Sequence, residues 1–209
     1  MARSEEAKCR ICRREGTKLY LKGERCHSDK CAFERKPYAP GQHGRDRKRE
    51  TEYRLQLREK QKVKATYGML EKQFRIFYHR SDVKRGATGE NLLSMLESRL
   101  DNVVFRLGLV ASRTQARQLI NHRHFTVNGV VTDIASFIVS ENDEIQVREK
   151  SRPKAVFKDS VEEAGNRVSI PSWLELNKEE FKGKVLRSPE RDDIVDDIKE
   201  HLIVELYSK

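Results

Sequence analysis

The apolar residues in the middle of the chain recur with the spacing of an α-helix. Between residues 92 and 107, leucines and valines return every three or four positions, which predicts one helix that begins at Thr88 and ends at Gly108. Two earlier helices are predicted over Thr51–Tyr67 and Met69–Tyr78. The apolar stripe of the second, which we expect to form core, is Leu70, Phe74, Phe77 and Tyr78.

A short amphipathic helix is predicted to follow the long one. Ser112 is a good N-cap, and Gln115 three residues later completes the pattern of a capping box. Its apolar face carries Ala116, Leu119 and Ile120. The opposite face, which we expect to be exposed and available to a partner, carries Thr114, Arg117, Gln118 and Asn121, with Arg113 at its flank.

Strands are predicted after this helix. His124–Val127 alternates apolar and polar residues, and Asn128-Gly129 is the pair typical of a type I′ hairpin turn that leads into Val130 and Val131. Asp133–Val147 is expected to form strands around a turn. Two more strands are expected over Pro171–Leu176 and Phe181–Arg187. The fold class is therefore α+β, with helices packed on a small antiparallel sheet.

Four cysteines near the N-terminus have the spacing C-x2-C-x13-C-x4-C. Two short pairs of thiolates can surround one tetrahedral Zn²⁺ without strain, and four protein ligands make such a zinc structural rather than catalytic. We expect this zinc to stabilise the fold of the N-terminal segment, which has few apolar residues. Two disulfides, buried structural cysteines, an iron–sulfur cluster and His27 as a substitute ligand are the alternatives. The predicted zinc ligands are Cys9, Cys12, Cys26 and Cys31.

Basic residues are concentrated in the first 90 positions. The 209-residue chain has 43 Lys and Arg against 33 Asp and Glu, and 25 of the basic but only 13 of the acidic residues precede residue 91. This segregation favours a polyanionic partner, since each neutralised phosphate releases condensed counterions. No signal peptide, lipidation motif or apolar run near the ~18 residues of a membrane span is recognisable. We therefore expect a cytoplasmic protein without a membrane partner.

Residues 32–49 lack periodicity and contain two Pro and two Gly. They predict an ordered or semi-ordered loop whose Tyr38, His43 and basic side chains contact RNA, with a disordered linker as the alternative. On the two helices that follow, basic side chains are expected on exposed faces, where their excess favours phosphate. They are Lys60, Lys62, Lys64, Lys72 and Arg75.

The order of a long helix, a tight turn, a short helix with Arg-x-x-x-Arg and an Asn-Gly hairpin resembles the S4 RNA-binding module. Other segments are similar to the S4 family of bacterial small-subunit ribosomal proteins, and together they cover nearly the whole chain. These segments are PGQHGR (Pro40–Arg45), QLREKQKVK (Gln56–Lys64), GENLLSMLESRLDNVVFRLG (Gly89–Gly108) and EHLIVELYSK (Glu200–Lys209).

The resemblance implies a structural constituent of the small ribosomal subunit, not an enzyme, which binds a helix junction in the 5′ domain of 16S rRNA and helps to start subunit assembly. It implies contacts with protein S5 and other small-subunit proteins that affect translational accuracy, and a basic loop close to mRNA near its entry channel. It also implies that the C-terminal segment returns to the N-terminal helices. The expected domains are 1–45, a zinc element with the basic loop; 46–90 with 188–209, a helical domain; and 91–187, an α/β domain whose RNA-binding module spans about 98–151.

The candidate RNA-binding residues follow from the basic loop, the first long helix and the short helix of the module. They are Arg35, Lys36, Arg45, Arg47, Lys48, Arg49, Arg58, Lys62, Arg113, Thr114, Gln115, Arg117, Gln118 and His122.

Two other classes of function share some of these features. Pseudouridine synthases carry the same module, and Arg99-Leu100-Asp101 is similar to their catalytic Arg-Leu-Asp, which suggests an accessory of an RNA-modifying enzyme. Asp101 lies in the module itself, however, and no P-loop or H-E-x-x-H motif is present. A zinc-finger regulator of duplex DNA should present several base-reading side chains in repeated fingers, which this chain lacks.

Overall fold

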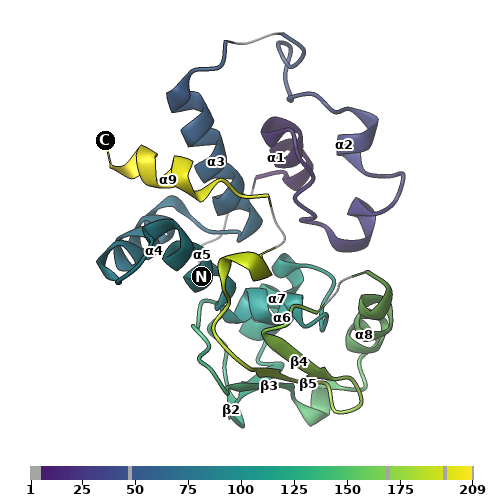
Figure 1. Cartoon of the computed structure of the whole chain (residues 1–209). Coiled ribbons are helices and arrows are strands. Elements are labelled where there is room, and N and C mark those ends of the chain that lie inside the picture. Colours follow the sequence, from purple (N-terminus) through teal and green to yellow (C-terminus); the bar gives the residue numbers. More distant parts are fainter. Residues whose placement is uncertain (1–5, 47–48, 168–169, 195–196, 209) are drawn as a thin grey trace. The chain divides into compact units, whose positions relative to one another are not determined.

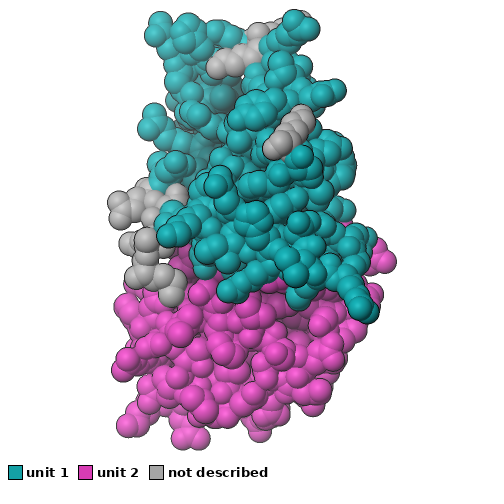
Figure 2. All heavy atoms as spheres, turned by 90° about the vertical axis from the view of Figure 1, so that its left-hand side faces the viewer, with its two compact units in different colours: residues 1–93, 196–209 teal, residues 94–195 magenta. Residues whose placement is uncertain are grey.

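The computed structural model describes residues 6–46, 49–167, 170–194 and 197–208. The chain forms two compact units, coloured separately in Figure 2: unit 1 comprises residues 1–93 and 196–209, and unit 2 comprises residues 94–195. Residues 188–194, expected in the helical domain, thus belong to unit 2, where Arg187 Nη1 donates to Asp193 Oδ2 at 2.7 Å. No helix in the described ranges is long and apolar enough to cross a membrane.

Unit 1 is built mainly from helices (Figure 1). Thr51 caps the first long helix, since its Oγ1 accepts from Arg54 N at 3.3 Å, and Gly68 ends it with a left-handed φ of 60°. Both ends match the prediction. The elements are α1 (Lys8–Glu15), η1 (Gly23–Cys26), α2 (Ala32–Arg35), α3 (Glu52–Thr66), α4 (Glu71–Val83), the start of α5 (Thr88–Glu97), and α9 (Glu200–Tyr207).

Helix α4 begins two residues later than predicted and continues five residues further, to Val83. Phe74, Phe77 and Tyr78 are buried as expected. Leu70 is 36% exposed, because it stands at the N-cap position, before the helical spacing begins. The predicted stripe is therefore core except at its first member.

The C-terminal helix α9 packs along α3, where Figure 1 shows the end of the chain beside an early helix. Gln56 Nε2 donates to Glu205 Oε2 at 2.9 Å, and Lys199 N donates to Glu59 Oε1 at 2.9 Å. The ring of Tyr207 stacks on that of Tyr78 at 4.4 Å between centroids. The expected return of the C-terminal segment to the N-terminal helices is thus confirmed within unit 1.

Unit 2 is centred on an antiparallel five-stranded sheet of order β2-β1-β3-β5-β4. The predicted hairpin is confirmed: Val127 pairs with Val130, and Asn128 and Gly129 have φ values of 50° and 79°, as a type I′ turn requires. The elements are α6 (Leu100–Arg106), α7 (Arg113–Asn121), β1 (Phe125–Val127), β2 (Val130–Val131), β3 (Glu144–Val147), η2 (Glu149–Ser151), α8 (Ala155–Arg167), β4 (Leu174–Asn177), β5 (Lys182–Val185) and η3 (Arg191–Asp193).

Helices α6 and α7 cover this sheet with apolar side chains. Leu107 approaches β5 so closely that a Cβ at Gly183 would lie 2.4 Å from its Cδ1. The absence of a side chain at Gly183 therefore permits the contact. Other fully buried members of this core are Leu100, Val103, Val104, Ala116, Ile120, Phe125, Ile145, Val147 and Phe157.

The single helix predicted from Thr88 to Gly108 is wrong, because the chain breaks it into α5 and α6 at Ser98 and Arg99. The strand expected at the start of Asp133–Val147 is wrong for a related reason. The backbone of this segment forms hydrogen bonds with the residues where the helix is interrupted. Leu100 N donates to Phe137 O at 2.8 Å, and Val139 N donates to Ser98 O at 2.9 Å. In place of the expected strand, the described residues form one isolated β-bridge between Arg99 and Ile138.

Candidate nucleic-acid interface

Helix α7 has the cap that its sequence predicts. Ser112 Oγ accepts from Gln115 N at 3.3 Å. Gln115 Oε1 accepts from Ala111 N at 2.8 Å, one residue before the position that a capping box uses. With Ala116 and Ile120 fully buried, the orientation of α7 is fixed. The polar side chains that it then exposes are Thr114, Gln118 and Asn121, followed by His122.

The prediction that Arg113 and Arg117 stand on an exposed face is wrong. The Arg117 side chain is only 15% exposed, and its Nη2 donates to Asp101 Oδ2 at 2.6 Å. The Arg113 side chain is 12% exposed; its Nε donates to Asn102 Oδ1 at 2.7 Å and its guanidinium lies over the Phe105 ring. Both arginines turn towards α6, because polar groups there bind them.

Buried carboxylates organise this part of unit 2. Asp101, with a side chain 4% exposed, also accepts from Arg99 Nη2 at 2.7 Å. Glu97, with a side chain 2% exposed, accepts from Arg106 Nη2 at 2.9 Å. Carboxylates so far from water need such partners. The Arg99-Leu100-Asp101 sequence is therefore part of a structural ion network.

The basic loop of unit 1 is held by contacts to α1. Arg13 Nε donates to the carbonyl oxygens of Lys36 and Tyr38 at 3.1 and 3.0 Å. The guanidiniums of Arg13 and Arg45 lie 5.1 and 4.5 Å from the centre of the Tyr38 ring. The loop is ordered by these contacts. The predicted side chains that it exposes are Arg35, Lys36, Arg45 and Arg49, while Arg47 and Lys48 lie outside the described residues.

Several lysines of α3 are paired rather than free on the surface, which corrects the expected exposed face. Lys60, at 7% exposure, donates from Nζ to Glu71 Oε1 at 2.6 Å, and Lys64 Nζ donates to Glu71 Oε2 at 3.2 Å. Burial raises the pKa of Glu71, but the two lysines outweigh it, so this pKa lies below its usual value. Lys62 Nζ lies 2.8 Å from Glu59 Oε1 and donates to Asp197 O. Lys72 and Arg75 of α4 are exposed as predicted.

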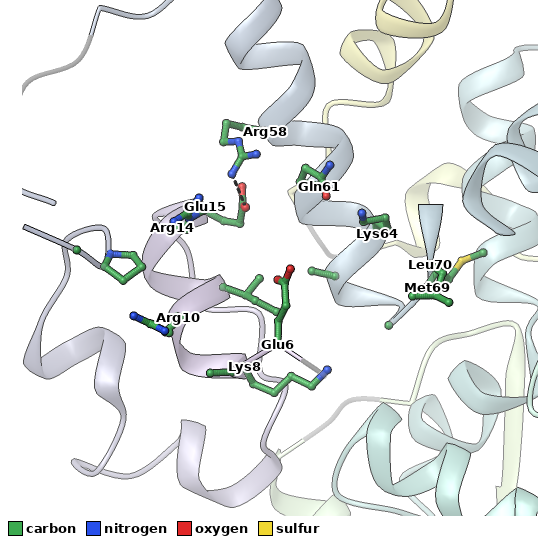
Figure 3. A pocket seen from close by; sticks show the side chains of 16 residues that line it. Glu6, Lys8, Arg10, Arg14, Glu15, Arg58, Gln61, Lys64, Met69 and Leu70 are labelled. Carbon is green, nitrogen blue, oxygen red and sulfur yellow. Dashed lines mark hydrogen bonds and ion pairs between the residues drawn. The ribbon is translucent and has the colours of Figure 1, made fainter. Parts of the chain in front are cut away.

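A hollow of about 780 Å³ lies between α1 and α3 in unit 1 (Figure 3). Arg58 Nη1 donates to Glu15 Oε1 at 3.1 Å inside it, and burial raises the pKa of this carboxyl despite the nearby arginines. Arg10 and Arg14 also line the hollow and are exposed, although the sequence did not single them out. Their separation of four residues, which puts them on one helical face, is the signal that could have found them.

The four cysteines line one small cavity of about 20 Å³ with Leu19, Leu21 and Phe33. None of them is in a disulfide. Cys26 Sγ accepts from Lys22 N at 3.4 Å, and burial raises the pKa values of the Cys12 and Cys26 thiols. As the side chains stand, no group of three or more His, Cys, Asp or Glu in the described ranges is arranged to hold a metal ion. The fold therefore brings the four predicted cysteine ligands to one cavity, but their side chains are not arranged as a coordination sphere.

Comparison with known proteins accounts for both units. The model of the "Ribosomal protein S4/S9 N-terminal domain" matches residues 3–97, and that of the "S4 domain" matches residues 98–145. Proteins named small ribosomal subunit protein uS4 align with all 209 residues and over their own full length. The identity is 60% for that of Clostridium tetani, 59% for Lawsonia intracellularis and 56% for Thermoanaerobacter sp.. The chain therefore belongs to the S4 family of small-subunit ribosomal proteins.

Proposed function

We propose that this chain is a structural, non-catalytic constituent of the small ribosomal subunit that binds rRNA, and that it acts on the ribosome in the cytoplasm. The observation that carries the proposal is its full-length identity of about 60% to proteins named small ribosomal subunit protein uS4. The excess of basic residues before residue 91 suits such a partner, since RNA binding releases counterions.

The site within the rRNA is a finer proposal, namely a helix junction in the 5′ domain of 16S rRNA. Two surfaces of the chain support it. One is the exposed face of α7, where Thr114, Gln118 and His122 can contact sugars and phosphates. The other is the loop bound by Arg13, where the exposed Arg45 lies over the Tyr38 ring before RNA binds, so that less entropy is lost on association.

Partners beyond rRNA belong to the same proposal. We propose that mRNA lies near Arg45 and Arg49, because both are exposed and the Arg45 guanidinium lies over the ring of Tyr38, whose carbonyl oxygen accepts from Arg13. Protein S5 and other small-subunit proteins are proposed as neighbours through which the chain affects translational accuracy. The proposal for S5 rests on the family resemblance alone.

The proposed cofactor is one structural Zn²⁺ held by Cys9, Cys12, Cys26 and Cys31. The common cavity of these cysteines supports it, since all four line the same small space. Four thiolates are a donor set that zinc prefers. Metal analysis of the purified chain should find one zinc per molecule and no labile sulfide.

Reconstitution with one omission tests the structural role. Small subunits assembled from rRNA and the other small-subunit proteins should stall as incomplete particles when this chain is left out, and addition of the purified chain should restore them. Complete particles formed without it would refute the proposed role in assembly.

A further inference from the structure

A second group of basic side chains lies in unit 2, next to the end of α7 but largely outside the predicted set. We call His122, His124, Arg148 and Lys154 the His124 cluster. Lys154 Nζ lies 3.4 Å from His124 Nε2, and the rings of His122 and His124 are 6.3 Å apart between centroids. Residues far apart in sequence therefore bring four basic groups to one place.

The geometry of the cluster is fixed by hydrogen bonds. Ser151 Oγ lies 2.9 Å from His124 Nδ1, which leaves Nε2 on the side of Lys154. Arg148 N donates to His124 O at 2.9 Å, and Arg148 Nη1 donates to Arg123 O at 3.1 Å. The strand β1, the turn η2 and the residue before α8 are thus tied together. His124 and Arg148 are therefore held in place before any ligand binds.

Like charges meet in this cluster without a carboxylate among them. The charged groups of the described chain that act on His124 are Lys154, His122 and Arg148, all of them basic. Arg123, the neighbouring cation, is occupied by Asp133 at 3.0 Å, and the first turn of α8 has no acidic residue. Burial and then these cations hold the pKa of His124 below its usual value. An anion bound here would relieve their mutual repulsion.

We propose that the His124 cluster is a phosphate-binding site and that its ligand is a backbone phosphate of the bound rRNA. This inference rests on the proposed function and deepens it by adding a contact in which Arg148 and Lys154, beyond the S4-domain match that ends at residue 145, join His122 and His124 within it. His122 and Lys154 are exposed, so a phosphate can reach both. Arginine, lysine and imidazolium groups all form charge-assisted hydrogen bonds with phosphate oxygens.

The first test is the salt dependence of binding to a 16S rRNA 5′-domain fragment. Lys154→Gln removes one phosphate contact, so the slope of log K against log salt should flatten by roughly 0.7 to 0.9. Lys178→Gln is the matched control, because Lys178 is an exposed lysine of unit 2 outside the cluster and should leave the slope unchanged. Equal slopes for wild type, Lys154→Gln and Lys178→Gln would overturn the site.

The second test follows the His124 ring by NMR in the full chain, with and without the fragment. A phosphate stabilises the imidazolium, so the pKa of His124 should rise on binding, and affinity should increase as pH falls through the interval between the free and bound pKa values. His124→Gln should abolish that part of the pH dependence. An unchanged pKa in an RNA-saturated sample would refute this site while rRNA binding itself stood. Failure of the wild-type chain to bind the fragment would contradict the proposed function and this site together.

Discussion

Two short basic helices, α1 in unit 1 and α7 in unit 2, present their arginines in different ways. On α1, Arg10 and Arg14 are exposed and line a hollow. On α7, Arg113 and Arg117 lie against Asn102 and Asp101. An arginine on a helix is thus available to RNA only where no buried acceptor lies within its reach. The number of basic residues in a segment does not reveal which of them are available.

Loss of the proposed zinc site should produce the largest difference in stability between the two units. Cys9→Ser with Cys12→Ser should abolish the proposed zinc binding and loosen only about the first 45 residues, because structural zinc contributes folding energy directly. Hydrogen exchange should therefore rise around α1 and η1 while the sheet of unit 2 stays protected. Loss of protection throughout unit 2 would contradict this division.

The ion network of α6 and α7 should matter most for stability. Asp101→Ala leaves the nearly fully buried Arg99 without this partner, and we expect a loss of about 3–5 kcal/mol in the free energy of unfolding of unit 2. Urea unfolding measures it. Asp159→Ala, at an exposed position of α8, is the control and should change stability by no more than about 0.5 kcal/mol.

Replacing the arginines of α1 should weaken RNA binding, whereas replacing those of α7 should lower stability. Arg10→Gln with Arg14→Gln should flatten the salt slope of rRNA binding by roughly 1.4 to 1.8, since two available cations are lost. Arg113→Gln with Arg117→Gln should lower the urea midpoint and leave the slope nearly unchanged, because these cations already bind protein groups. A flattened slope in the second variant would show that the α7 arginines also contact RNA.

The smallest expected effect is the pH dependence contributed by Glu71. Its pKa is depressed in the folded chain, so its stabilising contribution is present above the usual carboxyl pKa and is lost as pH falls through the depressed value. The side chain is 38% exposed and screened by solvent, so we expect less than about 1 kcal/mol. Glu71→Gln should remove this portion of the acid dependence of urea unfolding.

Local patterns predicted local structure well. Thr51 and Gly68 delimit α3, and Asn128-Gly129 forms the hairpin, because cap and turn geometry depend on neighbouring residues only. The break at Ser98 and Arg99 was not predictable, since apolar spacing continues through it and the competing hydrogen bonds come from residues near Phe137.

For the candidate sites too, local spacing was predictive, whereas contacts between residues distant in sequence were not predicted. The cysteine spacing predicted which four residues share a cavity. The inward turn of Arg113 and Arg117 was missed, because helical periodicity placed Arg117 opposite the apolar face and Arg113 at its flank, and it says nothing of Asp101 and Asn102 on another helix. The His124 cluster was missed for the same reason, since Lys154 reaches it from 30 residues further along the chain.

The most direct measurement of the central claim compares the affinity of the chain for a 16S rRNA 5′-domain fragment, a matched duplex DNA and an unrelated structured RNA over several salt concentrations. Salt weakens non-specific contacts with phosphates. If the chain also recognises the shape of the rRNA, its binding to the rRNA fragment should persist at salt concentrations that abolish binding by charge alone. We predict tight binding to the rRNA fragment alone above physiological salt. Equal binding to all three, lost together as salt rises, would contradict the account and leave a non-specific polyanion binder.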